Sequence, residues 1–213
     1  NARGFRNSSE HSITAEEGII RVVCSGDSFT LGYGVNNEET WPAVFSRFDE
    51  RFETINMGQG GYGVDQSYLW YKRDGIALDH QIHLFAFITG DFDRMRYSDF
   101  KGYPKPMLKV DIDENNAGSR TLVVENVPIS RLPYIVPKLL RYKNSIEALK
   151  TIQLLKPLIP SLGIQKGPLP FKDDSKDDVF DASRLLFSDL KTISKQKNIL
   201  LRLDKILISL KPR

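Results

Sequence analysis

The chain has 213 residues, of which 40% are hydrophobic and 27% are charged, so it can bury a core and lacks the composition of a disordered protein. Its net charge of +3 is too small to indicate nucleic-acid binding. Cys24 is the one cysteine, which excludes an internal disulfide, and its apolar surroundings predict a small core residue. No segment is long and apolar enough to predict a membrane span. The chain begins at Asn1, so the sequence leaves open an upstream segment, the compartment (cytoplasmic or extracytoplasmic) and the oligomeric state.

The first half of the chain predicts three buried strands, each followed by a polar or glycine-rich loop. The strands cover residues 19–25, 52–56 and 82–88, and the loops after them cover residues 26–35, 58–63 and 89–93. Helical segments separate the strands, and this alternation is typical of a doubly wound parallel sheet. We therefore expect a three-layer α/β/α fold with a flavodoxin-like parallel sheet. Residues 1–18 are expected to pack over the sheet edge.

Two helices are expected between these strands. Thr40 can cap the first, with Pro42 in its first turn, and Asp65 can cap the second. The first helix carries an apolar stripe at helical spacing, which predicts a core-facing surface. The stripe consists of Trp41, Val44, Phe45, Phe48 and Phe52.

The second half interrupts this rhythm. Residues 107–113 and 120–127 predict a β-hairpin within an insertion at 101–130, which is either a lid or substrate platform over the site or a decoration. Helices are expected at 133–156 and 178–197, with a proline- and glycine-rich connection at 157–170. Residues 199–210 are apolar enough for either a helix or a fourth strand.

Gly26-Asp27-Ser28 directly follows the first strand and is the candidate for chemistry. Open parallel sheets place reactive groups at the carboxyl ends of their strands, where the loops converge. A serine nucleophile needs a base for its proton, a group that orients the base, and donors for the oxyanion. The tripeptide alone is a weak signal. The two later glycine-rich turns strengthen it, because their backbone N–H groups could meet at one point.

Around three motifs, the lead-in Arg21-Val22-Val23, the run Gly34-Val35-Asn36-Asn37-Glu38-Glu39-Thr40 and the insertion from Pro104-Lys105-Pro106 to Asn126-Val127-Pro128 are similar to a bacterial branch of the SGNH/GDSL hydrolase superfamily. The three motifs themselves resemble, in order, the first sequence blocks of that superfamily. They are Gly26-Asp27-Ser28-Phe29-Thr30-Leu31-Gly32, Asn56-Met57-Gly58-Gln59-Gly60-Gly61-Tyr62-Gly63 and Gly90-Asp91-Phe92-Asp93. The resemblance covers residues 1 to 130 and fades beyond them. It implies one SGNH hydrolase-like domain over 1–213, with no metal or organic cofactor. The implied reaction is hydrolysis or transfer of an ester-linked acyl group, from a small molecule or a glycan, through a Ser28 acyl-enzyme.

The resemblance also assigns roles to individual residues. Ser28 would be the nucleophile, and the backbone N–H groups of Ser28 and Gly61 would form the oxyanion hole. Asp27 would serve the geometry of the turn rather than the chemistry. The remaining residues expected to line the site are Asn56, Thr89, Gly90 and Asp91.

The sequence departs from the family pattern at two places. Gly90 stands where the family has an asparagine that donates to the oxyanion, a loss that typically costs about a hundredfold to a thousandfold in rate unless Thr89 or a water substitutes. The family's Asp-x-x-His block is also missing. The histidines are His11 in the lead-in, and His80 and His83, which are expected near the sheet edge opposite Ser28. Either a C-terminal portion lies outside this chain or the chain is a degenerate member, and we expect little or no turnover from it.

Two other functions remain open. A hydrolase scaffold without its base could be a non-catalytic binding domain. Alternatively, Gly58-x-Gly60-x-x-Gly63 formally fits a dinucleotide-binding pattern, with Asp79 about twenty residues on as the ribose-binding acid. That reading leaves Gly26-Asp27-Ser28 unexplained.

Overall fold

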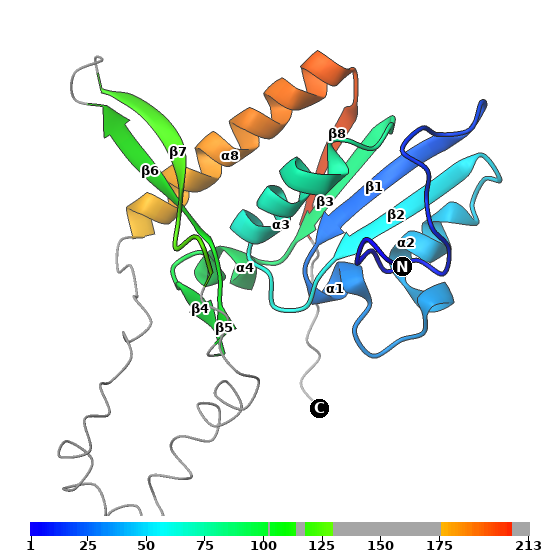
Figure 1. The fold of residues 1–213 in the computed structure, drawn as a ribbon, viewed down its shortest axis with the longest axis horizontal. Coiled ribbons are helices and arrows are strands. Elements are labelled where there is room, and N and C mark those ends of the chain that lie inside the picture. Colours follow the sequence, from blue (N-terminus) through cyan, green and yellow to red (C-terminus); the bar gives the residue numbers. More distant parts are fainter. Residues whose placement is uncertain (102, 114–117, 130–175, 206–213) are drawn as a thin grey trace, which may run out of the picture.

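A computed structural model describes residues 1–101, 103–113, 118–129 and 176–205 (Figure 1). Its main sheet has four parallel strands in the order β2-β1-β3-β8. The strands are β1 (Ile20–Gly26), β2 (Phe52–Gly58), β3 (Ile82–Phe87) and β8 (Leu200–Lys205). This confirms the three predicted strands, and within 199–210, where either a helix or a strand was expected, residues 200–205 form a strand while 206–210 lie outside the described residues. Because β2 and β3 lie on opposite sides of β1, the chain reverses its direction across the sheet at β1, as in flavodoxin-like folds.

The central strand β1 is buried on both faces. Val22, Val23 and Cys24 are all fully buried, and Val23 pairs with Ile55 on one side and His83 on the other. A strand covered on both faces reads as a continuous apolar run rather than an alternating one. Burial raises the pKa of the Cys24 thiol, which agrees with the prediction of an inert core residue.

Helices cover both faces of the sheet, so the predicted α/β architecture is confirmed. Ile55 and Met57 of β2 point into a cluster that includes residues of α3 (Val64–Trp70) and α8 (Lys176–Lys197). Thr54, which alternates with them along the strand, donates its hydroxyl to the Pro42 carbonyl of α2 (Trp41–Ser46) at 3.0 Å. Successive side chains of a strand point to opposite faces, so α2 lies on the face opposite α3 and α8.

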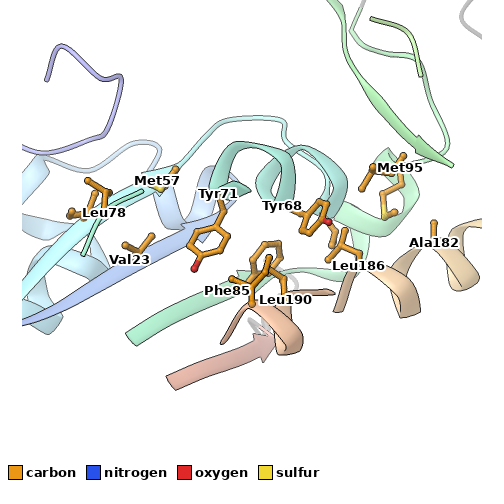
Figure 2. Close-up of a cluster of buried hydrophobic side chains, with 14 of the residues drawn as sticks. Val23, Met57, Tyr68, Tyr71, Leu78, Phe85, Met95, Ala182, Leu186 and Leu190 are labelled. Atoms are coloured by element: carbon orange, nitrogen blue, oxygen red, sulfur yellow. The ribbon is translucent and has the colours of Figure 1, made fainter. Parts of the chain in front are cut away.

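The main core lies between the sheet and the α3 and α8 pair (Figure 2). Phe85 of β3 lies at its centre, with Tyr68 of α3 and Leu186 and Leu190 of α8 pointing toward the same space in Figure 2. A polar contact also joins these helices, because the Tyr68 hydroxyl donates to the Asp189 carboxylate at 2.6 Å. The long helix α8 is therefore fixed to the sheet by apolar packing and to α3 by a hydrogen bond.

The first helix region differs from its prediction. Thr40 caps α2 by accepting from the Ala43 N–H at 3.4 Å, as expected, but the helix ends at Ser46. The apolar stripe is therefore not all core: Phe48 is 75% exposed beyond the helix, and Phe52 begins β2. A ring stack between Phe45 and Phe52, with centroids 5.1 Å apart, takes the place of the longer helix.

Two further local predictions were wrong. The N-cap of α3 is Gly63, and Asp65 lies in the first turn, where it binds Lys105 instead of capping the helix. Residues 89–93, expected as a loop, belong to the short helix α4 (Thr89–Arg94). That helix brings Asp91 and Arg94 onto one side, since residues three apart are neighbours on a helix.

The predicted hairpin is present. It consists of β6 (Met107–Asp113) and β7 (Ser119–Glu125), preceded by the short pair β4 (Asp99–Phe100) and β5 (Tyr103–Pro104). Figure 1 shows the hairpin against the first half of α8, and Leu108, Val110 and Leu122 join the same core cluster as Ala182. Arg120 also forms an ion pair with Asp181 of α8. The segments predicted at 133–156 and 157–170 lie outside the described residues.

The lead-in covers the sheet edge at β2, as predicted. The Arg6 N–H donates to the Asn56 carbonyl at 2.9 Å, and Asn7 exchanges side-chain hydrogen bonds with Thr54 and Asn56. The buried guanidinium of Arg21 donates to Glu53 and to the carbonyls of Ser12, Ile13, Thr14 and Asp79. The lead-in thus pairs with the edge strand β2, and Arg21 of β1 binds both the lead-in and Glu53 of β2.

Candidate active site

Ser28 lies at the carboxyl end of the central strand. It is the first residue of α1 (Ser28–Leu31), and it is partly exposed, whereas residues 21–27 before it are buried. Because the chain continues to β2 on one side of β1 and later to β3 on the other, the carboxyl end of β1 is the point where strand order reverses. Open α/β sheets bind their ligands in the crevice at this point.

Asp27 holds the turn in which Ser28 lies. Its Oδ1 accepts the Phe29 N–H at 2.9 Å, which caps α1, and its Oδ2 accepts the Ser28 hydroxyl at 3.4 Å. The side chain is buried. The capping bond fits the structural role that the family resemblance assigns to Asp27, while the second bond gives Ser28 a carboxylate partner.

Asn56 and Gly58 of β2 position α1 through contacts with its backbone. The Asn56 amide donates to the Thr30 carbonyl at 2.8 Å, and its oxygen accepts the Gly58 N–H at 2.9 Å. A Cβ on Gly58 would lie 2.0 Å from the Leu31 backbone nitrogen, so only glycine allows α1 to approach β2 this closely. Asn56, expected to line the site, therefore acts through α1, because both of its side-chain bonds are internal.

Gly61 lies in the loop after β2, which is tied to the end of β1 by a bond from the Gln59 N–H to the Gly26 carbonyl at 3.1 Å. Its φ of +81° is in the left-handed region, and a Cβ there would also strike the Phe100 ring at 2.4 Å. The position therefore requires glycine for two reasons. The bond to Gly26 brings the loop of Gly61 next to the loop of Ser28.

The third loop contributes Asp91 and Arg94 from α4. The Arg94 Nη1 atom donates to Asp91 Oδ1 at 2.5 Å, to Asp27 Oδ2 at 3.3 Å and to the Tyr62 carbonyl at 2.8 Å. One guanidinium nitrogen thus joins all three loops. Asp91 Oδ2 accepts the Ile88 N–H at 2.9 Å, which closes the turn after β3.

The environment of Asp91 changes its acidity. Burial, together with the adjacent Asp27 carboxylate, raises the pKa of the Asp91 carboxyl to about 7, against the opposing effects of the Ile88 N–H and Arg94. Asp91 therefore titrates near neutral pH. Sequence reasoning placed Asp91 at the site but missed Arg94, because an Asp-x-x-Arg spacing is informative only when the segment is recognised as a helix.

Thr89 and Gly90 begin α4, at the same end of the sheet. Thr89 is exposed, and a Cβ on Gly90 would meet only Ile88 Cδ1, at 3.8 Å, within the described residues. Space is therefore available at Gly90 for a side chain such as the asparagine of the family pattern. Whether Thr89 replaces that donor stays a prediction.

The three histidines are engaged elsewhere. His83 Nε2 bonds to the Ser25 hydroxyl at 2.9 Å, and its ring stacks on Tyr71, with centroids 3.7 Å apart. His80 bonds to the Tyr71 hydroxyl at 3.0 Å, and His11 bonds to Glu53 at 2.7 Å. Burial lowers the pKa of His83 well below its usual value and also lowers that of His80. These contacts assign structural roles to His80 and His83 and place His11 beside β2.

The structure gives the residues of the dinucleotide pattern other roles. Gly58 is needed against the backbone of α1, as described above. Asp79 precedes β3 at the amino end of the sheet, where it accepts the Ala15 N–H at 3.3 Å and its carbonyl binds Arg21. An acid that binds a ribose must lie at the carboxyl end of the strands, so Asp79 does not fit the pattern.

A cavity of about 700 Å³ lies away from Ser28, between the lead-in and the amino-terminal parts of β1 and β2. Its walls include Glu53, which binds both His11 and Arg21, and the exposed Glu50. Among the described residues, no group of three or more His, Cys, Asp or Glu side chains is placed to hold a metal ion. No described helix combines the length and apolarity required to cross a membrane.

Comparisons with known proteins concern the fold alone. No protein-family model matches the sequence, and no curated protein sequence matches it. One solved structure that it resembles is a member of the lipolytic G-D-S-L family from Veillonella parvula DSM 2008. That match has 13% identity over 85% of this chain and 76% of the other, with a TM-score of 0.30.

Two further solved structures give similar matches. A protein described as lipolytic and of the G-D-S-L family, from Desulfitobacterium hafniense DCB-2, has 17% identity over 86% of this chain and 76% of its own, with a TM-score of 0.30. The SGNH-hydrolase family esterase AlinE4 has 12% identity over 85% of this chain and 98% of its own, also at 0.30. The structural neighbours are thus GDSL and SGNH hydrolases over about 85% of the chain, at identities and TM-scores that leave the function to be argued from the residues themselves.

Proposed function

We propose that the chain is a serine hydrolase or acyl transferase that acts on an ester-linked acyl group through a Ser28 acyl-enzyme. The observation that carries the proposal is the position of Ser28, a partly exposed hydroxyl at the carboxyl end of the central strand, where the loops after β1, β2 and β3 are joined by hydrogen bonds. The proposed oxyanion donors are the backbone N–H groups of Ser28 and Gly61. The resemblance of the three motifs to SGNH hydrolases supports the same roles.

The surroundings of Ser28 suit an acyl substrate. Phe29, the next residue, is 42% exposed, and Tyr33, just after α1, is 83% exposed. Exposed aromatic side chains beside a nucleophile can contact the apolar part of an acyl group. The alcohol from which the acyl group is taken, a small molecule or a glycan, stays a prediction of the resemblance.

A non-catalytic binding domain is the second candidate. It is favoured by one observation, that all three histidines are engaged away from Ser28. Without an activating base, a serine hydrolase loses several orders of magnitude in rate and retains only its binding and oxyanion effects. The domain boundaries proposed for 1–213, with an insertion at 101–130, are common to both candidates.

Labelling with a fluorophosphonate distinguishes the two candidates, because the probe forms a covalent bond with an activated serine. We expect slow labelling of the full chain at a single residue and its loss in Ser28→Ala, as measured by intact mass and peptide mapping. Ser25→Ala is the matched control, because the Ser25 hydroxyl is buried against His83. Labelling that persists in Ser28→Ala would refute Ser28 as nucleophile, and an unlabelled wild-type chain would support the binding domain.

A further inference from the structure

One buried carboxyl group contacts the Ser28 hydroxyl, and a second is linked to the first through Arg94. The roles proposed so far do not use their chemistry. Asp27 Oδ2 accepts the Ser28 hydroxyl at 3.4 Å, and the Asp27 carboxylate is close enough to Asp91 to raise the pKa of that carboxyl. Both side chains are buried, and both bind the Nη1 atom of Arg94. Hydrogen bonds therefore link Ser28 to Asp27, Asp27 to Arg94 and Arg94 to Asp91, so that the two acids share one cation.

The charges around this pair favour retention of one proton. Two adjacent carboxylates repel each other when both are ionised, and burial strengthens that repulsion. Arg94 of α4 is the cation that contacts both acids among the described residues. Asp65 of α3 and Lys105, which precedes β6, also lie on this side, but they neutralise each other in an ion pair of 2.7 Å.

We propose that Asp27 and Asp91 act together as the base that takes the proton of the Ser28 hydroxyl, the task for which serine hydrolases ordinarily use a histidine. This inference rests on the proposed function. A single carboxylate with an ordinary pKa near 4 is a weak base for a hydroxyl. A pair that shares a proton binds that proton about as strongly as an imidazole does, because the pKa of Asp91 is raised to about 7 by burial and by Asp27.

The proton and electron movements of the step balance. With both acids ionised, the proton of Ser28 moves to Asp27, while Oγ forms a bond to the ester carbonyl carbon and the C=O electron pair moves onto the oxyanion. When the tetrahedral intermediate collapses, the C=O bond forms again and the bond to the leaving alcohol breaks. The pair then returns its proton to the departing alkoxide. Water repeats the sequence in reverse to release the acid and Ser28.

The test is the pH dependence of fluorophosphonate labelling in the full chain, in which the Ser28 proton must likewise move to the pair as fluoride leaves. We expect the labelling rate to rise about tenfold per pH unit up to about pH 7 and to level off above it. In Asp91→Asn, the transition near neutrality should disappear and the rate on the plateau should fall about a hundredfold. Asp27→Asn should act in the same way, because asparagine keeps the helix cap while removing the charge.

Asp93→Asn is the matched control, because Asp93 is exposed on the same helix and the variant should keep the wild-type profile. Circular dichroism establishes that each variant is folded. A transition near pH 7 that persists unchanged in Asp91→Asn, with Ser28 still labelled, would overturn the inference and leave the proposed function standing. Absence of Ser28 labelling in the wild-type chain at every pH would overturn both.

Discussion

At the scale of single residues, the position of Ser28 depends on how closely α1 approaches β2. Gly58 makes this approach possible, since a Cβ would lie 2.0 Å from the Leu31 nitrogen. We expect Gly58→Ala to lower the free energy of unfolding by about 1–3 kcal/mol and to reduce Ser28 labelling, because the backbone of α1 must move. Urea unfolding and fluorophosphonate labelling measure the two effects.

Gly60→Ala is the matched control, two residues along the same loop. A Cβ there would meet only Leu31 Cδ2, at 3.8 Å, within the described residues, and Gly60 is exposed. We expect its free energy of unfolding to change by less than about 0.5 kcal/mol. Equal losses in the two variants would show that the loop is sensitive to any side chain and that the contact of Gly58 with α1 is not the cause.

The sequence motifs identified some residues of the site and not others. Ser28, Asp27, Gly61 and Asp91 were chosen from their motifs, and the structure brings their loops together through hydrogen bonds. Arg94 was missed, because its link to Asp27 joins positions far apart in sequence. The direction in which Asn56 points also depends on α1, which no local pattern reveals.

At the scale of elements, the buried ion pair of Asp65 and Lys105 connects α3 to the base of the hairpin. The two side chains are 0% and 3% exposed, with 2.7 Å between their charged atoms. We expect Lys105→Met to lower the free energy of unfolding by about 3–5 kcal/mol, because it leaves Asp65 buried without its cation. Asp65→Asn combined with Lys105→Met should lose less than the sum of the two single variants.

Urea unfolding of the two single variants and the double variant measures this coupling. Lys109→Met is the control within the hairpin, because Lys109 pairs with Glu125 at 3.6 Å near the surface, and it should cost at most about 1 kcal/mol. If the Asp65 and Lys105 effects simply add, the pair does not connect the hairpin to α3 in the way described.

The elements differ in how well their sequences specify them. The strands were predicted within two residues, since their apolar runs end at glycine or polar residues. The boundary between α2 and β2 was misplaced, because Phe45 and Phe52 fit helical spacing as well as the ring stack that they form. The choice of a strand for 200–205 depends on pairing with β3, which is information from the other half of the chain.

At the scale of the whole molecule, buried histidines make stability depend on pH. Burial holds the folded pKa of His83 well below its usual 6.5, so the unfolded chain binds a proton below that pH while the folded chain does not. The free energy of unfolding should therefore fall as pH decreases below 6.5, by up to about 1.4 kcal/mol per pH unit for such a group. Asp91 acts in the opposite direction between 3.8 and about 7, because its folded form keeps the proton longer.

The His83→Gln variant separates these contributions, because an amide can still bond to Ser25 but does not titrate. It should lower stability at neutral pH through the lost stack on Tyr71. The unfolding free energy at about pH 7.5 minus that at about pH 5.5 should nevertheless be about 1 kcal/mol smaller in the variant than in the wild type. Urea unfolding at both pH values measures it. An unchanged difference would mean that His83 does not control the acid side of the stability curve.

The strand order indicates the order in which the strands of the sheet form during folding. Strands β1, β2 and β3, with all the residues proposed to act at Ser28, come from the continuous stretch between Ile20 and Arg94, whereas β8 returns to the sheet only after α8. Short loops close at a lower entropic cost than long ones, and local pairings form faster. We therefore expect the three-strand unit to form first, so that the proposed catalytic groups meet before the edge strand β8 is added.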